Sequence, residues 1–412
     1  MRNHRLTAIS LTIFLFACNA LTSVAQGRWG KTVNFSGMDQ FWKIVDSMEK
    51  DIEPTEEQWN ALFRTPGYSY LVNVEHKNDL FKRLFPLVFM PSRQHELEKK
   101  LEEDNMDAKY YLPHYLKVKE NRAGLIKLQS EFENKDLLGE ALKRTRQYLP
   151  PGVIERFPPP TVAFVIFEPD GHADPSVIAI DLLYALNKDD LIGFIGHEAH
   201  HYYLGTIAKG KLPDRNSDEY YLFRSINQLR LEGMGDLIDK TDILNEKADP
   251  GKDEKAQRYR KDFRRLYYET PETFRRIDQL ISEISDDPSK MKENARKVWD
   301  LLPYGAHPSG YFMSRALVDH VGRNVLIKEM VNPFAFIRLY NKVAKKAMKK
   351  SQGKYYVFSD KTMDFLSKFE KQYVSQSRKP NITHAAQQLI QPDASIVFLS
   401  TLISPVCQND TR

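Results

Sequence analysis

Hydrophobic positions recur at helical spacing through the first third of the chain. In the stretch PTEEQWNALF, Trp59, Leu62 and Phe63 occupy the i, i+3 and i+4 positions of one buried helix face. We therefore expect residues 27–155 to form a helical N-terminal region. Within that region the same periodicity predicts helices over residues 76–90, 92–104 and 119–148.

The hydrophobic period changes after the proline-rich stretch RFPPP. The run TVAFVIF, residues 161–167, is β-branched and aromatic and has the length of a strand. SVIAIDLLYAL, residues 176–186, predicts a second strand that continues into a helical turn. A helix is then expected between Asn187, as its N-cap, and Gly205, which ends it. Helical periodicity returns over residues 217–240.

These elements predict an α+β fold that is predominantly α-helical, with one small sheet. The proline-rich stretch separates the N-terminal region from a second region over residues 160–375. Residues 376–412 then form a C-terminal tail for which the sequence indicates no role. Hydrophobic residues make up 42% of the chain and charged residues 28%, a composition typical of a folded protein with a buried core.

The charge pattern argues against two classes of partner. The formal net charge is +5, and Lys and Arg alternate with Asp and Glu along most of the chain, as on solvated helix surfaces. Recognition of nucleic acid or of an anionic membrane needs a concentrated basic face. We therefore expect no nucleic-acid partner. Because no apolar run reaches spanning length, we also expect no transmembrane helix.

The first residues have the pattern of a secretory signal peptide. MRNHR supplies positive charge, LTAISLTIFLFACNAL is an uncharged apolar run, and SVA ends at Ala25 as a small-x-small cleavage site. We therefore expect residues 1–25 to be removed and the mature protein to be exported, either periplasmic or secreted. The alternative is that LFAC is a lipobox and that Cys18 carries a lipid anchor, making a membrane-anchored lipoprotein, although Phe16 fits that motif poorly.

One short stretch, GHEAHH, carries the candidate chemistry. In a helix, His197 and His201 stand one turn apart on the same face, at a separation that one zinc ion can bridge. Glu198 flanks that pair, where a general base for the attacking water has to lie. The H-E-x-x-H pattern occurs once in the chain. His200, by contrast, is expected to hydrogen-bond nearby or to face solvent.

The alternative interpretation is a surface helix that happens to be rich in histidine. The apolar stretch LIGFIG directly before the motif argues against it, because this stretch predicts a buried helix end. Burying neutral imidazoles without partners is costly, and a bound metal removes that cost. The sequence therefore favours a metal site.

A catalytic zinc ion has three protein ligands, so a third ligand is expected from another element. The stretch RLEGMGDLID offers Glu232, with Asp236 one helical turn later to accept the other N–H of a ligand histidine. Gly233 and Gly235 lack side chains, which would let this helix approach its partner closely. The neighbouring acid Asp239 is expected to be solvated or to act as a cap.

The order H-E-A-H-H followed by E-G-M-G-D resembles the gluzincin group of zinc metallopeptidases. The Glu232 and Asp236 pair is similar to the Glu-x-x-x-Asp of thermolysin, but the 31 residues from His201 to Glu232 make a longer gap than in thermolysin itself. The phrases PTEEQWNALFRTPGY, VIAIDLLYAL and HPSGYFMSRAL look closest to a bacterial domain-of-unknown-function family described as zinc-dependent peptidases. The resemblance implies a zincin-like metallopeptidase domain over residues 160–375, one catalytic zinc ion (Zn²⁺) on the ligands named above, and a peptide or protein substrate.

The resemblance also implies a second donor for the developing oxyanion. Thermolysin-like enzymes use a tyrosine and a histidine for this, and the stretch YGAHPSGYFM offers His307 and Tyr311 as catalytic residues. The alternative is a tight turn with a packed tyrosine. The strand near residues 176–182 is expected to lie along the cleft as the edge that pairs with an extended substrate.

These observations favour an exported zinc peptidase that hydrolyses peptide bonds with Glu198 as general base. An endopeptidase is favoured over an aminopeptidase because no G-x-M-E-N-like sequence precedes the zinc motif. The alternative is a catalytically silent surface or binding protein on a zincin-like scaffold, which would have no physical need of Glu198. A purely structural zinc is least favoured, because no cysteine is available to close a four-ligand shell.

Overall fold

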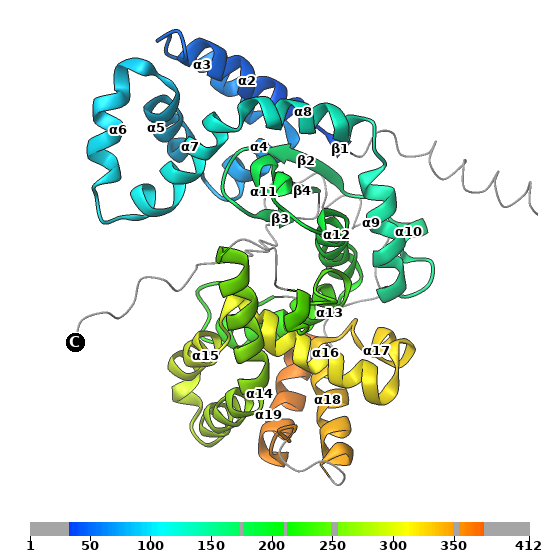
Figure 1. The fold of residues 1–412 in the computed structure, drawn as a ribbon. Helices are drawn as coiled ribbons and strands as arrows, with labels where there is room; N and C mark the ends of the chain where they lie inside the picture. Colours follow the sequence, from blue (N-terminus) through cyan, green and yellow to red (C-terminus); the bar gives the residue numbers. More distant parts are fainter. Residues whose placement is uncertain (1–32, 174–175, 210–211, 249–253, 349–353, 375–412) are drawn as a thin grey trace, which may run out of the picture.

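The structure is a computed structural model, and it describes residues 33–173, 176–209, 212–248, 254–348 and 354–374. The expected signal peptide, the alternative anchor at Cys18 and the C-terminal tail therefore lie outside the described residues. Within them the fold is α+β and predominantly α-helical, with one small sheet, as predicted from the sequence (Figure 1).

The sheet consists of β1 (Val33–Asn34), β2 (Thr161–Val165), β3 (Gly171–Ala173) and β4 (Val177–Asp181), in the spatial order β1-β2-β4-β3. β1, β2 and β4 are parallel, whereas β3 runs antiparallel to β4. The sequence predicted β2 and β4. The prediction that the strand near residues 176–182 is a sheet edge is wrong, because β4 is hydrogen-bonded on both sides and β3 takes the outer position.

The N-terminal region forms a series of short helices, some of which pack against the sheet (Figure 1). They are α2 (Ser36–Met48), α3 (Glu56–Phe63), α4 (Pro66–Asn73), α5 (Asn78–Phe89), α6 (Gln94–Leu101), α7 (Leu112–Glu120), α8 (Arg122–Glu133), α9 (Leu137–Thr145) and α10 (Val153–Arg156). Phe41 of α2, Phe85 of α5 and Phe164 of β2 are fully buried together in one hydrophobic core. This first core therefore extends across the proline-rich stretch that separates the two regions in the sequence.

The second half of the described chain is helical and builds a second hydrophobic core. After β4 come α11 (Leu182–Leu186), α12 (Leu191–Ile207), α13 (Tyr220–Asp239), α14 (Glu254–Asp286), α15 (Met291–Asp300), α16 (His307–Val321), α17 (Arg323–Glu329), α18 (Pro333–Ala347) and α19 (Asp360–Tyr373). In Figure 1 the helices from α13 onward lie on the side of the molecule opposite the sheet. Phe274, Phe336 and Tyr340 are fully buried between these helices.

Helix α12 connects the two cores. Its residues Ile195 and Ala199 are buried in the first core, and Tyr203 and Leu204 one turn later are buried in the second. Such a helix has no solvated stripe along its middle, which explains why all residues from Gly193 to Leu204 are buried. Side chains projecting from the middle of α12 therefore lie where the two cores meet.

The ends of α12 differ from the sequence prediction. The N-cap is Asp190, whose side chain accepts a hydrogen bond from the Gly193 amide at 2.9 Å. Asn187 instead ends α11, where its side-chain amide donates to the carbonyl of Leu183. The helix also continues through Gly205 to Ile207, because burial against the second core outweighs the small helix penalty of one glycine.

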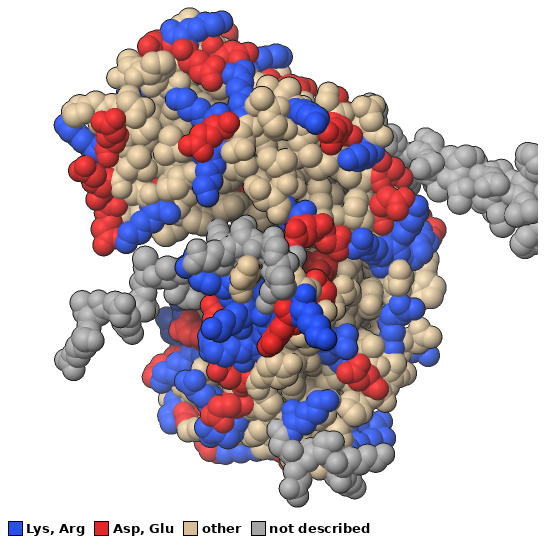
Figure 2. All heavy atoms as spheres, in the orientation of Figure 1, with Lys and Arg blue, Asp and Glu red and all other residues tan. Residues whose placement is uncertain are grey.

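Charged side chains of both signs are scattered over the face of the molecule shown in Figure 2, as expected for solvated helix surfaces. Among the described residues, surface ion pairs also form within single helices, such as Arg275 with Glu272 and Lys297 with Glu293. Among the described residues, no helix combines the length and the apolar character needed to cross a bilayer.

Candidate metal centre

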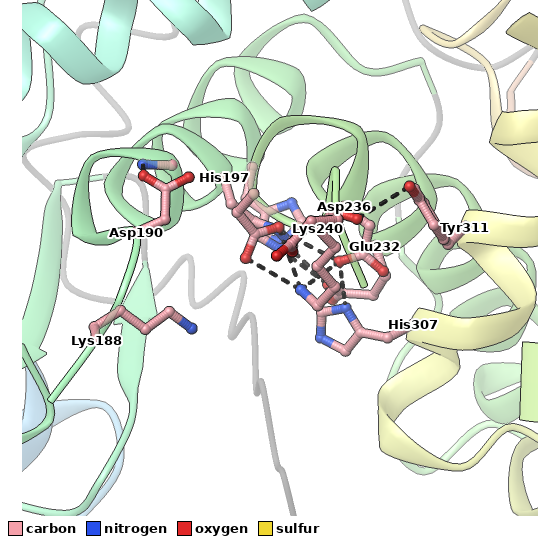
Figure 3. A network of polar contacts seen from close by, with 12 residues as sticks. Lys188, Asp190, His197, Glu232, Asp236, Lys240, His307 and Tyr311 are labelled. Carbon is pink, nitrogen blue, oxygen red and sulfur yellow. Dashed lines mark hydrogen bonds and ion pairs between the residues drawn. The ribbon is translucent and has the colours of Figure 1, made fainter. Parts of the chain in front are cut away.

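Three potential ligands converge where the two cores meet. His197 and His201 project from α12 and Glu232 projects from α13; Figure 3 shows His197 and Glu232 side by side. The Nε2 atoms of His197 and His201 are 2.8 Å apart, and they lie 3.3 Å and 3.2 Å from Glu232 Oε2. Ligand atoms placed tetrahedrally around zinc at its usual bond lengths are separated by about 3.3 Å. The donor atoms therefore surround a point that one such ion would fit.

The protonation pattern of His197 also fits a metal ligand. Its Nδ1 atom lies 3.0 Å from Asp239 Oδ1, so Nδ1–H donates to that carboxylate and Nε2 presents its lone pair toward His201 and Glu232. Asp236, the predicted supporting acid, lies farther from this ring, with its Oδ1 3.6 Å from His197 Nδ1. Asp239 was expected to be solvated or to cap a helix; instead its side chain is 4% exposed.

His307, at the start of α16, joins this centre. Its Nδ1 atom lies 2.8 Å from Asp236 Oδ1, and its Nε2 atom lies 3.2 Å from Glu232 Oε2. The sequence had singled out His307 for its position beside a turn, and the structure places its ring against a candidate ligand (Figure 3). Asp236 thus supports His307, whereas Asp239 supports His197.

Lys240, at the end of α13, links the two supporting aspartates. Its Nζ atom lies 2.6 Å from Asp236 Oδ1 and 3.2 Å from Asp239 Oδ2. The ammonium group offsets part of the negative charge that these carboxylates and Glu232 bring into a buried region. Burial raises the pKa of Glu232, but the surrounding histidines outweigh burial and hold it well below its usual range. Glu232 is therefore ionised.

Tyr311 lies close to these residues but faces another group. Its hydroxyl donates a hydrogen bond of 3.1 Å to the backbone carbonyl of Lys240, and its ring is buried. Burial raises the pKa of Tyr311 to about 12. The structure therefore uses this hydroxyl to join α16 to the end of α13 and does not direct it at the converging donor atoms.

Glu198 has the environment of a buried base. It is 5% exposed, and no described residue donates a hydrogen bond to its carboxylate. Burial raises its pKa, while His201 and His197 oppose that rise. A carboxylate with these properties can accept a proton more readily than one in water. His200, in contrast, has a structural role: its Nε2 atom donates a hydrogen bond of 3.1 Å to the backbone carbonyl of Tyr148, as expected.

Two glycines of α13 allow the close helix contacts, as the sequence suggested. A Cβ atom on Gly235 would lie 2.6 Å from Cε1 of the His197 ring, and one on Gly233 would lie 2.3 Å from the carbonyl oxygen of Gly310 in α16. Any side chain at Gly235 would therefore displace the ring of a candidate ligand. The glycines set the spacing between α13 and the helices that carry His197 and His307.

A second histidine–carboxylate group lies between β3 and the N-terminal helices, and sequence reasoning missed it. His172 Nδ1 is 2.5 Å from Glu75 Oε1, and His172 Nε2 is 3.4 Å from Glu168 Oε1. Lys77 Nζ lies 2.5 Å from the same Glu168 oxygen. The stretch FEPDGH, with acids two and four residues before the histidine, was the available signal. Glu75 and Lys77 come from a distant loop that the sequence could not place beside it.

Comparison with known families is consistent with the metal centre. A family model described as "Putative zinc dependent peptidase (DUF5700)" matches residues 59–349, more than half of the chain, including every residue of the centre. The resemblance to such a family inferred from the sequence is thereby confirmed. No curated protein and no solved structure gives a significant match.

Proposed function

We propose, from the premise that this chain belongs to that family of zinc-dependent peptidases, that it hydrolyses peptide bonds at the centre formed by His197, His201 and Glu232. In this proposal the three residues bind one catalytic zinc ion. The observation that carries it is the convergence of two imidazole nitrogens and one carboxylate oxygen from two helices within 2.8–3.3 Å of one another. The zincin-like character of the domain is part of the same proposal.

Glu198 is the proposed general base. A zinc ion bound at this centre would supply Lewis-acid activation of a water molecule and of the substrate carbonyl. The Glu198 carboxylate would take the proton from that water and pass it to the leaving amide nitrogen. Its burial and its lack of hydrogen-bond donors among the described residues support this role, since both favour proton uptake.

His307 is the better candidate of the two predicted oxyanion donors. Its Nδ1 is held by Asp236 and its Nε2 contacts Glu232, so the ring is fixed beside the proposed reaction centre, and Nε2 would exchange Glu232 for the oxyanion to act as donor. Tyr311 would act indirectly, through its hydrogen bond to the Lys240 carbonyl. Removing the Tyr311 hydroxyl should therefore impair hydrolysis less than removing the His307 ring.

The proposal includes export. The signal-peptide pattern of residues 1–25 supports a periplasmic or secreted protein, and Cys18 supports the lipoprotein alternative. Expression of the full chain with and without Cys18→Ser, followed by mass analysis of the mature protein, distinguishes the two. Cleavage after Ala25 in both forms supports the signal peptide, whereas a lipid mass lost with Cys18 supports the anchor.

The decisive experiment is Glu198→Gln in the full mature chain loaded with zinc. We expect zinc content to stay at one ion per chain while cleavage of a broad peptide library falls by about 10²–10⁴-fold, because only proton transfer is lost. Glu57→Gln, an exposed change on α3, is the matched control. Cleavage retained by Glu198→Gln would refute the base assignment. A zinc-loaded wild type that cleaves nothing would favour the catalytically silent scaffold.

A further inference from the structure

Lys188 is a cation near the metal centre that the proposed chemistry does not use. It lies in the short connection between α11 and α12 and is half-buried. Its Nζ atom donates to the hydroxyl of Tyr184 at 2.7 Å. The ammonium group also lies 5.0 Å from the centre of the Tyr184 ring and 4.6 Å from that of Phe194. These aromatic contacts hold the charged end of the side chain in one place.

Phe194 relates this ammonium group to the proposed ligands. It precedes His197 by three residues on α12, so both side chains lie on the same face of the helix, about one turn apart. The Lys188 ammonium group therefore packs against a side chain that lies about one helical turn before His197, and it interacts electrostatically with Asp239, which contacts His197. Figure 3 shows the Lys188 side chain extended toward the residues of the centre.

The charge of Lys188 has no carboxylate partner among the residues that the structure describes. Its only polar contact there is the phenol of Tyr184. Asp239 interacts electrostatically with Lys188 without contacting it. The Asp239 carboxylate already contacts His197 and Lys240. Burial lowers the pKa of Lys188, but Tyr184 and Asp239 outweigh burial, so the side chain is an ammonium ion at neutral pH.

We infer that Lys188 is a specificity-determining residue that binds a carboxylate of the peptide substrate close to the cleaved bond. This inference rests on the proposed peptidase function and adds a substrate class to it. A held ammonium group without a carboxylate partner among the described residues, packed on the helix that carries His197, suits an acidic ligand. That carboxylate can come from an Asp or Glu side chain or from the free C-terminus of a short peptide.

The test uses the zinc-loaded mature chain and matched short peptides. One pair carries Glu or Gln at each position around the cleaved bond, with an amidated C-terminus. The other pair carries only Gln and ends in a free carboxylate or in an amide. We expect kcat/KM to be about ten-fold higher for the acidic member of one pair, as for a hydrogen bond to a charged group. The pair that shows the preference identifies the source of the carboxylate.

Substitutions at residue 188 separate recognition from a structural role. Lys188→Met should reduce the preference to about one-fold with little loss on the neutral peptide, Lys188→Arg should retain it, and Lys188→Glu should reverse it. Lys328→Met, an exposed change on α17, should leave it unchanged. No preference in the wild type, or an equal loss on both peptides in Lys188→Met, would overturn the inference.

A binding measurement separates this inference from the proposed function. Zinc-loaded Glu198→Gln should bind the labelled acidic peptide about ten-fold more tightly than the neutral one, and adding Lys188→Met should remove the difference. Selective binding without cleavage by the wild type would overturn the peptidase proposal alone. Cleavage without a preference that depends on Lys188 would overturn the specificity inference alone.

Discussion

Two of the buried clusters of histidine and carboxylate among the described residues differ in what the ring nitrogens face. In the first, His197 and His201 turn their Nε2 atoms toward each other and toward Glu232. In the second, His172 turns one nitrogen toward Glu75 and the other toward Glu168. Both clusters bring together residues that are distant in sequence, and both would satisfy a search based on distance alone.

The His172 cluster contains its own cations. His172 is a single imidazole whose two nitrogens each face a carboxylate, so no second ring nitrogen of the described residues converges with it on a shared point. Lys77 adds a second positive charge, with its Nζ atom 2.5 Å from Glu168 and 3.3 Å from Glu75. The position that a cation would occupy is therefore already taken by protein groups.

The centre at His197 has no such internal cation between its donor atoms. Two lone-pair-bearing nitrogens 2.8 Å apart repel unless a proton or a metal lies between them and the nearby carboxylate. Its lysine, Lys240, contacts the supporting aspartates and not Glu232. The comparison teaches that the convergence of two imidazole nitrogens on one carboxylate oxygen, more than the presence of histidine beside acid, separates a metal site from a salt-bridge network.

The largest expected difference between the clusters is in zinc binding. Glu232→Gln should remove one of the three proposed zinc ligands. Losing a residue that only supports a ligand typically lowers zinc affinity by about 10–100-fold, and the loss in this variant should be larger. Glu168→Gln, the matched change in the other cluster, should leave zinc content unchanged. Zinc per chain after dialysis against a chelator checks both. Equal zinc loss in the two variants would remove the distinction.

The second expected difference is in stability. His172→Gln should lower the free energy of unfolding by about 3–5 kcal/mol, because it leaves the buried Glu75 carboxylate without its imidazolium partner. Zinc content should stay the same. Urea unfolding of the mature chain measures the effect, with the exposed His95→Gln as control. An unfolding midpoint identical to that of the wild type would show that this cluster is not a stabilising network.

A smaller effect is expected from the glycine that faces His197. Gly235→Ala places a methyl group 2.6 Å from the imidazole ring, so the ring must shift and zinc affinity should fall by about 10–100-fold. Gly124→Ala on α8 meets no atom within 4 Å. That control should leave zinc binding intact and stabilise the helix by up to about 1 kcal/mol. Competition with a chromogenic chelator gives the affinities, and unchanged binding in Gly235→Ala would contradict the proposed role of His197.

The most gradual expected difference is a pH dependence of stability that belongs to His172. Burial lowers the pKa of His172, but Asp170 and Glu75 outweigh burial and raise it to about 10 from its ordinary value of 6.5. A raised pKa stabilises the fold fully below 6.5, and that contribution is lost as the pH rises toward 10. The free energy of unfolding of the wild type should therefore decline over this range. His172→Gln should show a flatter profile, and parallel profiles would argue against a protonated His172.

The long helices and the His197–His201 part of the site could be predicted from sequence because both follow from the geometry of a single helix. Helical periodicity located α12 and α13, and the i, i+4 spacing of His197 and His201 follows directly from helix geometry. β1 and β3 span two and three residues, too few to show an alternating pattern, so they were missed. Helix caps were misplaced by a few residues because several polar residues near 187–190 compete for the N-cap.

The rest of the site could not be predicted from the sequence because it depends on contacts between helices that are distant along the chain. Glu232 was identified from its residue type and its glycine neighbours, but the choice between Asp236 and Asp239 as the partner of His197 depends on the rotation of α13 against α12. No local pattern reports that rotation. The direction of the Tyr311 hydroxyl likewise depends on where the end of α13 lies, which is set by packing in the second core.

The shared position of α12 in both cores has a consequence for how related chains can vary. His201 and Glu232 are 31 positions apart, yet most of that separation lies within α12 and α13 themselves, and only the short stretch 208–219 connects the two helices. Interior packing fixes both helices, so the connector can lengthen or shorten without moving either donor atom. Counting residues between histidine and glutamate is therefore a poor criterion for recognising this kind of centre, and the small residues at the helix crossing are a better one.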